Sequence, residues 1–453
     1  MTEPNVLVGA SPLSQSEGRK LTFVDSPLKR AERFTYLGWE LNGQTVTGHW
    51  SSDALVFAES VTFETGGDLE TPATQAVIGL WYLVAGLSYY KTGAARIIDL
   101  GESPLGTAGR DFFHAALIDG LGEYSFRNKL PLNDVQIIGG VSVSPVPVSV
   151  NPNKVVTPFG GGIDSVVTVT HLSRHLTQSL FVMSPASGPF APLEATAAVT
   201  GLPILRVTRT LDEKLLRKNS DFINGHVPVT AMVTLLACVS AVAHGYGGVA
   251  MSNEHSSSVP NMTWNGQAIN HQWSKSAMAE VLLARAVAER IGDAFVVASF
   301  LRDRSEIWVA QEMAQQSPYL SVFRSCNRAF AQEESKRASN WCGECDKCLF
   351  INLVLAPFLS RSALKEIFGS EPLANPSLLE QLEVLVGLRS EHKPFECVGD
   401  PDESAAALQQ IADKTEWSDV EHLSELASRL NPQASFDSLL IPQGENRVPA
   451  HWL

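Results

Sequence analysis

Apolar and polar residues alternate along the N-terminal part of the chain, between about residues 20 and 65, and this pattern predicts β-strands. The alternating segments are 34–39, 45–50, 55–57 and 60–63. Asn42 and Gly43 stand between the first two segments, and both residue types tolerate the positive φ of a type I′ turn. We therefore predict a hairpin that continues as a β-meander.

Apolar residues then recur three and four positions apart, as they do along one face of a helix. This spacing predicts helices over residues 74–90 and about 109–128. A group of prolines follows and marks a domain boundary near residue 150, namely Pro145, Pro147, Pro152 and Pro158. Residues 1–150 are therefore expected to form an N-terminal α+β domain, to which we assign a substrate-binding role.

Strand-like and helix-like segments alternate after this boundary. The predicted strands cover 155–157, 180–183, 204–207, 248–251 and 294–298. The predicted helices between them include one from about Asp164, one ending near Thr200, and the segments 227–244 and 273–291. Strands separated by helices form a parallel sheet covered on both faces, so an α/β fold is predicted for residues 151–358. Residues 359–453 are expected to form an acidic, helical C-terminal region.

The composition is that of a globular protein, because 44% of the 453 residues are hydrophobic and 18% are charged. Even the most apolar stretch, 227–243, is interrupted by polar residues, so we expect a buried helix there and not a membrane span. The formal net charge is −14, and the segment 371–453 carries most of it, with 15 acidic and five basic residues. The nearly neutral remainder argues against a nucleic-acid partner.

The first residues show no basic stretch followed by an apolar one, so we expect no secretory signal. Three of the six cysteines lie within residues 342–348, which suits a metal site in a reducing compartment better than a secreted disulfide framework. A cytoplasmic location is therefore expected.

The segment Pro158-Phe-Gly-Gly-Gly-Ile-Asp-Ser165 lies directly after a predicted strand and directly before a predicted helix. Its consecutive glycines allow a tight turn whose N–H groups point at an anion, and the helix dipole favours phosphate there. We expect Asp164 and Ser165 to cap the helix. The segment lacks the lysine of a GxxxxGK[ST] loop and does not fit GxGxxG. A glycine-rich turn without a ligand is the alternative.

Cys342-Gly-Glu-Cys345-Asp-Lys-Cys348 places three thiols two residues apart, and Cys326 lies upstream. Four thiolates suit tetrahedral Zn²⁺, and the short loops bring successive sulfurs around one ion. An iron–sulfur cluster is the rival metal group, and buried free thiols are the alternative without metal. Cys238 and Cys397 are expected to be ordinary core or surface thiols.

The glycine segment resembles the PP-loop of the ATP pyrophosphatases, Ser-Gly-Gly-x-Asp-Ser, with Gly160 where the first serine usually stands. The resemblance implies that the loop holds ATP with Mg²⁺ and that the enzyme adenylates a substrate and releases pyrophosphate. The implied ligands are Gly160, Gly161, Gly162, Asp164 and Ser165, with Ser184 and Asn253 bordering adenine and ribose by analogy. Loop capping is the alternative role for Ser184 and Asn253. The cysteine cluster is similar to that of the 7-cyano-7-deazaguanine synthases, which are also PP-loop enzymes, and this implies structural zinc.

Further motifs resemble one family in particular, the ATP-dependent UDP-N-acetylmuramoyl-L-alanyl-L-glutamate epimerases of peptidoglycan synthesis. They are Gly86-Leu-Ser-Tyr-Tyr-Lys91, Gly120-Leu-Gly-Glu-Tyr124, Arg127-Asn128, Ser252-Asn-Glu-His-Ser256, Val259-Pro-Asn-Met262 and Asn270-His-Gln-Trp-Ser-Lys-Ser276, together with the glycine segment. The likeness runs from about residue 74 to 358. It implies epimerisation of the terminal L-glutamate of UDP-MurNAc-L-Ala-L-Glu through an adenylated carboxylate, with AMP and pyrophosphate as products.

The resemblance also implies site residues. Glu254, His255, His271 and Lys275 are the candidates for base, acid or carboxylate-holding groups, and the ring of histidine titrates near neutrality, which favours His271 and His255. Tyr90, Lys91, Arg127 and Asn270 are the candidates for holding the sugar nucleotide. Polar loop residues held by backbone, and an amphipathic helix surface, are the respective alternatives.

Two other functions remain open from the sequence. One is a PP-loop enzyme that modifies tRNA or a deazapurine base, which the cysteine cluster fits but the N-terminal 150 residues and the acidic charge do not. The other is a nucleotide-binding protein without turnover, for which the missing serine at Gly160 leaves room. The partners expected on the epimerase interpretation are small molecules only, with no nucleic acid and no membrane, and the oligomeric state is open.

Overall fold

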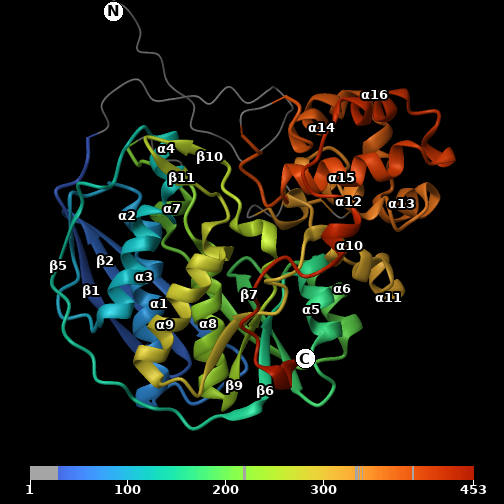
Figure 1. Cartoon of the computed structure of the whole chain (residues 1–453). Coiled ribbons are helices and arrows are strands. Elements are labelled where there is room, and N and C mark those ends of the chain that lie inside the picture. The colour runs from blue at the N-terminus through green and yellow to red at the C-terminus, as the bar shows by residue number, and fades with distance from the viewer. Residues whose placement is uncertain (1–28, 218–220, 332–334, 336, 339, 390–391) are drawn as a thin grey trace, which may run out of the picture.

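The computed structural model describes residues 29–217, 221–331, 335, 337–338, 340–389 and 392–453 (Figure 1). The expected absence of a secretory signal concerns the first 28 residues, as does the beginning of the alternating pattern near residue 20. Both predictions therefore lie outside the described residues.

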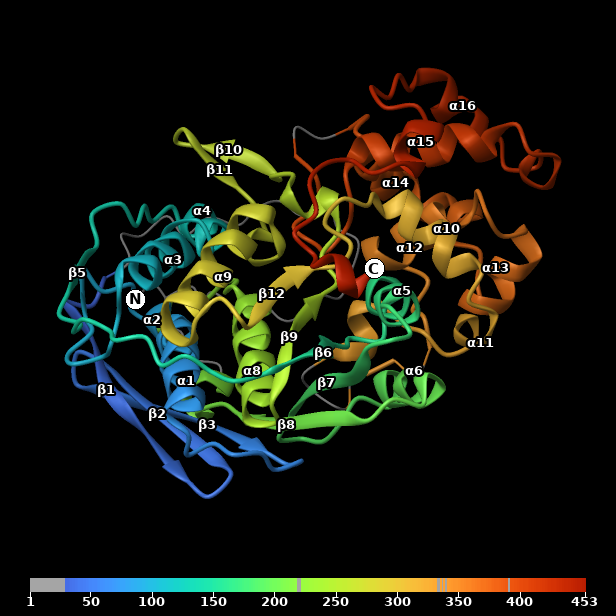
Figure 2. The same cartoon turned by 60° about the horizontal axis from the view of Figure 1, so that its bottom comes forward.

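A single ten-stranded sheet runs through the molecule in the order β12-β9-β6-β7-β8-β3-β2-β1-β4-β5 (Figures 1 and 2). Its strands are β1 (Arg33–Asn42), β2 (Thr45–Ser52), β3 (Leu55–Phe63), β4 (Ile97–Asp99), β5 (Gln136–Ile138), β6 (Asn151–Pro158), β7 (Thr177–Pro185), β8 (Ile204–Thr210), β9 (Tyr246–Met251) and β12 (Val296–Ser299). A separate hairpin is formed by β10 (Met262–Trp264) and β11 (Gln267–Ile269). The strands before and after residue 150 belong to the same sheet, and the predicted division there stays a prediction.

The half of the sheet from β12 to β8 is entirely parallel, which confirms the parallel sheet predicted from alternating strands and helices. Along the chain β6 comes first, followed by β7 and β8 on one side of it and by β9 and β12 on the other. The direction of winding therefore reverses between β6 and β9. Ligands of open α/β sheets bind beside the carboxyl ends of the strands at such a switch point.

The other half contains the predicted meander, since β1, β2 and β3 pair in antiparallel order and β3 joins β8. The turn of the first hairpin lies one residue later than predicted. Asn42 pairs with Thr45, so Gly43 and Gln44 form the turn, and Gly43 has φ +59°. The predicted Asn42-Gly43 turn is wrong because the register of the strands places Asn42 in the ladder.

Helices cover both faces of the parallel half of the sheet and one face of the meander. One face carries α1 (Pro72–Ala85), α2 (Leu87–Tyr90), α3 (Thr107–Ile118), α4 (Gly122–Arg127), α8 (Val229–Ala243) and α9 (Ala277–Ile291), and Figure 2 shows α1, α8 and α9 lying along it. The other carries α5 (Ile163–His171), α6 (Ala191–Thr200), α10 (Glu306–Ala314), α11 (Ser317–Leu320) and α12 (Asp346–Leu355). Each face has its own hydrophobic core. The apolar segment expected to be a buried helix is α8, which packs against β9 and α1.

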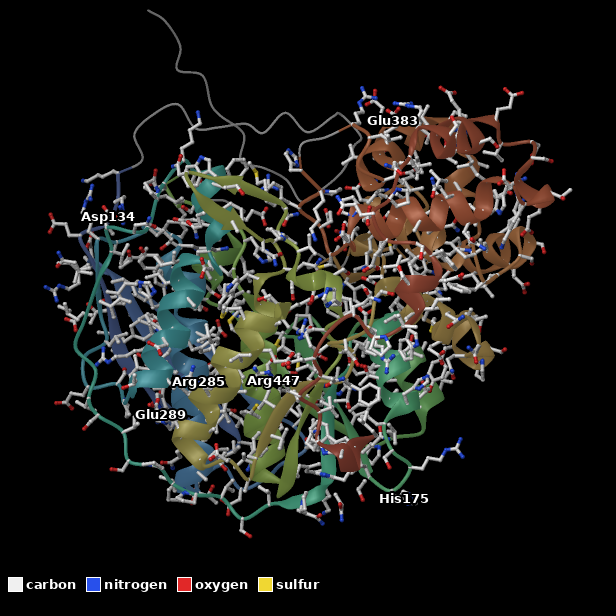
Figure 3. The ribbon with its side chains drawn as sticks, viewed as in Figure 1. Asp134, His175, Arg285, Glu289, Glu383 and Arg447 are labelled. Carbon is white, nitrogen blue, oxygen red and sulfur yellow. The ribbon has the colours of Figure 1, made fainter. Side chains whose placement is uncertain are left out.

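Glu289, labelled in Figure 3, fastens α9 to α3. Its carboxylate oxygens accept hydrogen bonds from the N–H groups of Ala108 (3.0 Å) and Gly109 (2.9 Å) in the first turn of α3. A carboxylate at this position satisfies free N–H groups and complements the helix dipole. It thereby fixes α3, and with it the loop leading to α4, against the core of the sheet.

The C-terminal region is helical, as predicted, and consists of α13 (Arg361–Phe368), α14 (Leu379–Leu385), α15 (Pro401–Ala412) and α16 (Glu421–Arg429) besides short 3₁₀ turns. Its apolar residues share one core with α5, α10 and α12. The last residues return to the sheet, where Trp452 is buried against Gly248 of β9. Among the described helices, none combines the length and the apolar character that crossing a bilayer demands.

Candidate active site

The glycine segment forms the turn between β6 and α5 at the carboxyl edge of the sheet. Gly161 has φ +73°, and a Cβ there would lie 3.3 Å from the Cα of Leu193, so glycine is required on both counts. A Cβ on Gly160 would meet nothing within 4 Å, so this position has room for the serine of the PP-loop motif. The turn therefore keeps the backbone shape that the sequence predicted for an anion cradle.

The beginning of α5 is not capped in the predicted way. Gly162 occupies the N-cap position, and among the described residues no side chain caps its first turn. Ser165 instead donates its hydroxyl hydrogen to the carbonyl of Gly162 (3.1 Å). The predicted capping by Asp164 and Ser165 is wrong, and the first-turn N–H groups are left available to a ligand.

Three carboxylates converge beside this turn, from Asp164 in α5, Glu254 after β9 and Glu306 at the start of α10. Oxygen atoms of the three lie within 4.8 Å of one another. Glu254 and Glu306 are buried, and one oxygen each of Asp164 and Glu306 is buried without a hydrogen-bond partner among the described residues. Such a set of hard oxygen ligands fits Mg²⁺.

The electrostatics of the cluster agree with that fit. Burial and the negative charge of Glu254 raise the pKa of Asp164, while Lys347 and Lys275 oppose the rise. Burial, Asp164 and Glu254 likewise raise the pKa of Glu306. Three acids held together away from water repel one another, and a cation among them would relieve that repulsion.

Arg302 positions two of the predicted residues. Its guanidinium is buried in an ion pair with Glu280 (2.8 Å) and donates to the backbone carbonyls of Glu254 (2.9 Å) and Lys275 (2.7 Å). The loop that carries Glu254 and the turn that carries Lys275 are therefore fixed to each other through one planar donor group.

A second cluster lies across the site and joins Glu123 of α4 to His271. Glu123 accepts from Arg127 Nε (2.5 Å) through one oxygen and contacts His271 Nδ1 (2.5 Å) through the other. The ring of His226 lies against that of His271, with centroids 4.2 Å apart and the ring planes tilted by 39°. Lys91 belongs to the same neighbourhood, since its charge, like that of Arg127, influences His226.

These contacts shift the titration of the cluster. Burial alone would raise the pKa of Glu123, but the hydrogen bond and charge of His271 lower it to about 2. Burial alone would lower the pKa of His271, but its hydrogen bonds with Cys397 and Glu123 raise it to about 10. Burial and the charge of His271 lower the pKa of His226 to about 3. The structure thus pairs a cationic ring with a neutral one.

Cys397 was expected to be an ordinary thiol, but its side chain interacts with the imidazole of His271. Burial alone would raise the pKa of the Cys397 thiol, but the charge of Lys275 and the hydrogen bond to His271 lower it to about 6. Lys275 also faces Glu254 and Asp164, whose charges, together with that of Cys397, raise its pKa above the ordinary value. Lys275 therefore links the carboxylate cluster to the Glu123–His271–Cys397 array.

Sequence reasoning missed several of these groups, namely Glu306, Lys347, Lys393 and Cys397. Lys393 is 4% exposed, and its ammonium group has no hydrogen-bond partner among the described residues. Lys347 lies within the cysteine motif, but the motif did not indicate that its side chain acts on the carboxylate cluster. The other residues are isolated in the sequence, and no spacing pattern marks them.

The remaining predicted residues have other partners. Tyr90 donates to the carbonyl of Ala95 (3.0 Å), Asn270 donates to that of Ser257 (2.9 Å), and Ser184 accepts from Arg206 (3.1 Å). The backbone of Asn253 is held on both sides by the hydroxyl of Ser299. His255 lies by the C-terminal segment, near Gly444. The ligand and catalytic roles of these residues stay predictions.

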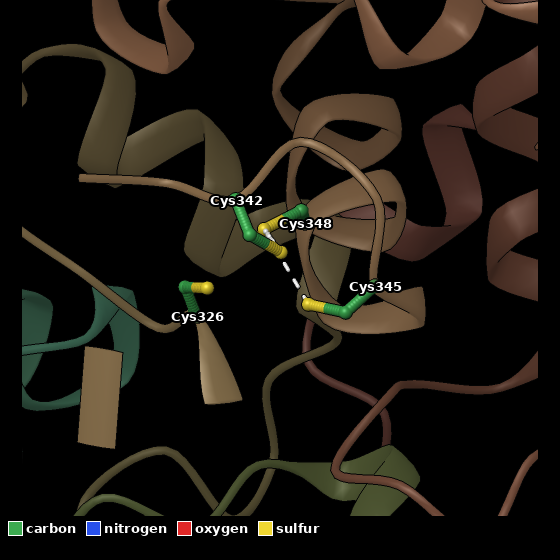
Figure 4. Close-up of side chains that lie close together, drawn as sticks. All are labelled: Cys326, Cys342, Cys345 and Cys348. Carbon is green, nitrogen blue, oxygen red and sulfur yellow. Dashed lines mark hydrogen bonds between the residues drawn. The ribbon is translucent and has the colours of Figure 1, made fainter. Parts of the chain in front are cut away.

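The four clustered cysteines come together as predicted (Figure 4). Their sulfur atoms all lie within 4.8 Å of one another, and Cys348 is 3.5 Å from Cys342 and 3.4 Å from Cys345. With Zn–S bonds of about 2.3 Å, sulfurs around tetrahedral zinc stand about 3.8 Å apart. The arrangement therefore fits one zinc ion with little adjustment.

The segment that supplies Cys326 also supports the glycine turn. The N–H of Arg324 donates to the carbonyl of Gly161 (3.1 Å), and a Cβ on Gly162 would lie 2.6 Å from the hydroxyl of Ser325. Residues 324–326 therefore connect the cysteine cluster to the candidate phosphate site.

Comparison with known proteins assigns the chain to a family. A family model described as the MurL N-terminal domain matches residues 26–300, and a second, described as the MurL C-terminal domain, matches residues 322–439. The chain belongs to the MurL family. This confirms the family that the motifs resembled, and the first model covers all ten strands of the main sheet.

Three relatives of this MurL chain have the same name. A UDP-N-acetyl-alpha-D-muramoyl-L-alanyl-L-glutamate epimerase of Micromonospora sp. is 35% identical over 443 residues, which cover 93% of this chain and 97% of the relative. Epimerases of the same name from Salinispora tropica and Xanthomonas oryzae pv. oryzae are 36% and 31% identical, over 83% and 85% of this chain and 82% and 86% of theirs. No solved structure was found to match the chain.

Proposed function

We propose that this chain epimerises the terminal L-glutamate of UDP-MurNAc-L-Ala-L-Glu to D-glutamate, in the synthesis of peptidoglycan precursors, and that ATP drives the reaction. Membership in the MurL family and the names of the relatives support the substrate and the epimerisation. The observation that carries the ATP dependence is the glycine turn with three converging carboxylates beside it, two of them buried, at the switch point of the sheet.

The chemistry explains why such an enzyme would use ATP. The α-proton of a terminal glutamate is hard to remove while the neighbouring carboxylate is ionised, because the carbanion would add charge beside charge. Attack of that carboxylate on the α-phosphorus of ATP forms an acyl–AMP bond and releases pyrophosphate. The acyl group is then uncharged at its carbonyl and can delocalise the electron pair of the broken C–H bond as an enolate.

Reprotonation on the opposite face would give the D-configuration, and water would then cleave the acyl–AMP bond to yield carboxylate and AMP. In this proposal Gly160, Gly161, Gly162 and the first turn of α5 hold phosphate oxygens through backbone N–H groups. Lys275 would hold the carboxylate near them. His271 and His255 would take part in the proton-transfer step, and Lys91 and Arg127 would bind the sugar nucleotide.

Mg²⁺ belongs to the same proposal, and Asp164, Glu254 and Glu306 are the residues that would hold it. The unpartnered buried oxygens of Asp164 and Glu306 support the fit. When bound, the ion would neutralise phosphate charge.

Zinc is proposed separately for Cys326, Cys342, Cys345 and Cys348, in a structural role. All four thiols serve as ligands, which leaves no open coordination position for substrate.

Dipeptide-dependent ATP cleavage tests the proposed activity. The purified chain with ATP and Mg²⁺ should release AMP and pyrophosphate when UDP-MurNAc-L-Ala-L-Glu is added, and should release neither when the α-carboxylate of the L-Glu residue is replaced by a carboxamide. Release stimulated by tRNA, or release without an acceptor, would contradict the proposal.

A further inference from the structure

The Glu123–His271–Cys397 array suits the proton transfer at the α-carbon, a step for which the proposed function does not specify the base on each face. We propose that Cys397 is the catalytic base on one face of that carbon and that His271 and Glu123 are its positioning residues. This inference rests on the proposed function, because it needs an acyl group whose α-proton can be removed.

The thiol and the imidazole are held together from both sides. Asn261 Nδ2 donates to the carbonyl of Pro394 (2.7 Å), while Asn261 Oδ1 accepts from the N–H of His271 (2.7 Å). Gln272 Nε2 donates to the carbonyl of Val398 (3.0 Å). The segment that carries Cys397 is therefore hydrogen-bonded to the loop that carries His271 on both sides of the thiol.

The imidazole is oriented by its other partner. His271 Nδ1 is engaged by Glu123 (2.5 Å), which fixes the orientation of the ring, and the same ring interacts with Cys397. A carboxylate, an imidazole and a thiol in series is the arrangement that activates cysteine in nucleophilic enzymes, since the imidazolium stabilises the thiolate. His271 itself, placed between two anionic partners, is a poor proton acceptor, which leaves the thiolate as the base.

The array also lies where the reacting carbon is expected. Lys275 interacts with Cys397 on one side and with Glu254 and Asp164 on the other. The α-carbon of the substrate is one bond away from the carboxylate that is activated at the phosphate site. Lys393, four residues before Cys397, is buried, and the charges of Asp400 and Glu254 act on it, so the same segment also reaches the carboxylate cluster.

The proposed step is balanced as a proton transfer. The Cys397 thiolate forms an S–H bond as the Cα–H bond breaks, and the electron pair of that bond moves into the enolate of the acyl adenylate. A solvent-exchangeable donor on the opposite face then gives a proton to Cα. The thiol returns its proton to solvent, which restores both groups.

Substitution of Cys397 separates proton transfer from ATP use. In D₂O, Cys397→Ala should still catalyse dipeptide-dependent exchange of labelled pyrophosphate into ATP. Its incorporation of deuterium at Cα and its formation of D-glutamate should fall by about 10²–10⁴-fold, the contribution of a general base. Cys238→Ala, which alters a thiol buried in the hydrophobic core around α8, is the control and should keep both activities.

Two results would overturn this inference, and a third would contradict the proposed function on which it rests. Full Cα exchange in Cys397→Ala would overturn it, and so would an equal loss of pyrophosphate exchange and epimerisation in a variant with an unchanged melting temperature. Absence of dipeptide-dependent pyrophosphate exchange in the unaltered protein would instead contradict the proposed function.

Alkylation of the unaltered protein gives an answer even if the variant fails to fold. The charged groups facing Cys397 are His271 and Lys275 from one turn, Lys347 from α12 and Asp164 from α5. Iodoacetamide should modify Cys397, identified by peptide mass spectrometry, with a half-maximal rate near pH 6, and His271→Gln should move that midpoint upward. A midpoint at the ordinary thiol value of about 8.5 in the unaltered protein would overturn the inference.

Discussion

Single glycines determine the shape of the turn between β6 and α5. Gly161 adopts a left-handed conformation with Leu193 against it, whereas Gly160 faces open space. The segment 158–165 could be identified from sequence because its chemistry is local. Cys397, Glu306 and Lys393 could not, because tertiary contacts between distant segments bring them to the site and no local spacing records those contacts.

Gly161→Ala should weaken ATP binding beyond its effect on stability. A left-handed alanine costs about 1–2 kcal/mol, and the added Cβ would also push the turn away from Leu193. Gly201→Ala is the matched control, because Gly201 has φ +63° with nothing near its Cβ position. Both variants should lose similar unfolding free energy in urea, while calorimetry should show loss of ATP affinity only for Gly161→Ala. Equal affinities would contradict the assignment of the turn.

Glu123→Gln should lower the pKa of His271 from about 10 toward its ordinary value, because the raised pKa depends in part on that carboxylate. A raised folded-state pKa means that His271 stabilises the fold fully below about pH 6.5 and that this stabilisation disappears as the pH rises through about 10. Titration of the ¹⁵N-labelled imidazole by NMR measures the shift. An unchanged pKa of His271 in Glu123→Gln would show that the contact with Glu123 does not determine the protonation of the imidazole ring.

Elements long enough to repeat a pattern were predicted from sequence, and shorter ones were not. The meander β1–β3, the five parallel strands and the helices α1, α5, α8 and α9 follow their apolar periodicities. The strands β4, β5, β10 and β11 contain three residues each, too few for alternation to appear. The hairpin turn was placed wrongly because the register, set by tertiary pairing, outweighed the local preference of Asn42-Gly43.

The cysteine cluster and the glycine turn should respond to metal together. Cys342→Ser should reduce the bound zinc from about one ion per chain, lower the melting temperature and weaken ATP binding, since Arg324 connects the two elements. Cys238→Ala is the control and should retain the metal. Metal analysis that finds neither zinc nor iron in the unaltered protein would contradict a structural metal.

At the scale of the whole molecule, the C-terminal region completes the core of the sheet. Its helices share apolar contacts with α5, α10 and α12, and its segment around Cys397 reaches the site built by the other elements. Sequence predicted that the region is helical and acidic, but not that it contributes to the site. The composition of a region indicates its charge and secondary structure. Its contacts with other regions depend on how the chain folds back onto them.

Trp452→Ala should test how firmly the chain end is fixed to the sheet. Trp452 is 1% exposed and packs against Gly248, so its removal should cost about 3–5 kcal/mol of unfolding free energy. Leu453→Ala, at a residue 69% exposed, should change stability by less than about 0.5 kcal/mol. Urea denaturation measures both values, and a similar small effect for both would show that the end does not contribute to the core.

The most direct test is chiral analysis of the glutamate released from UDP-MurNAc-L-Ala-L-Glu after incubation with the protein, Mg²⁺ and one of three nucleotides. D-glutamate should appear with ATP and with β,γ-methylene-ATP, which still allows cleavage between the α- and β-phosphates, and should be absent with α,β-methylene-ATP, which does not. D-glutamate formed equally with α,β-methylene-ATP, or without any nucleotide, would contradict activation of the carboxylate by adenylation.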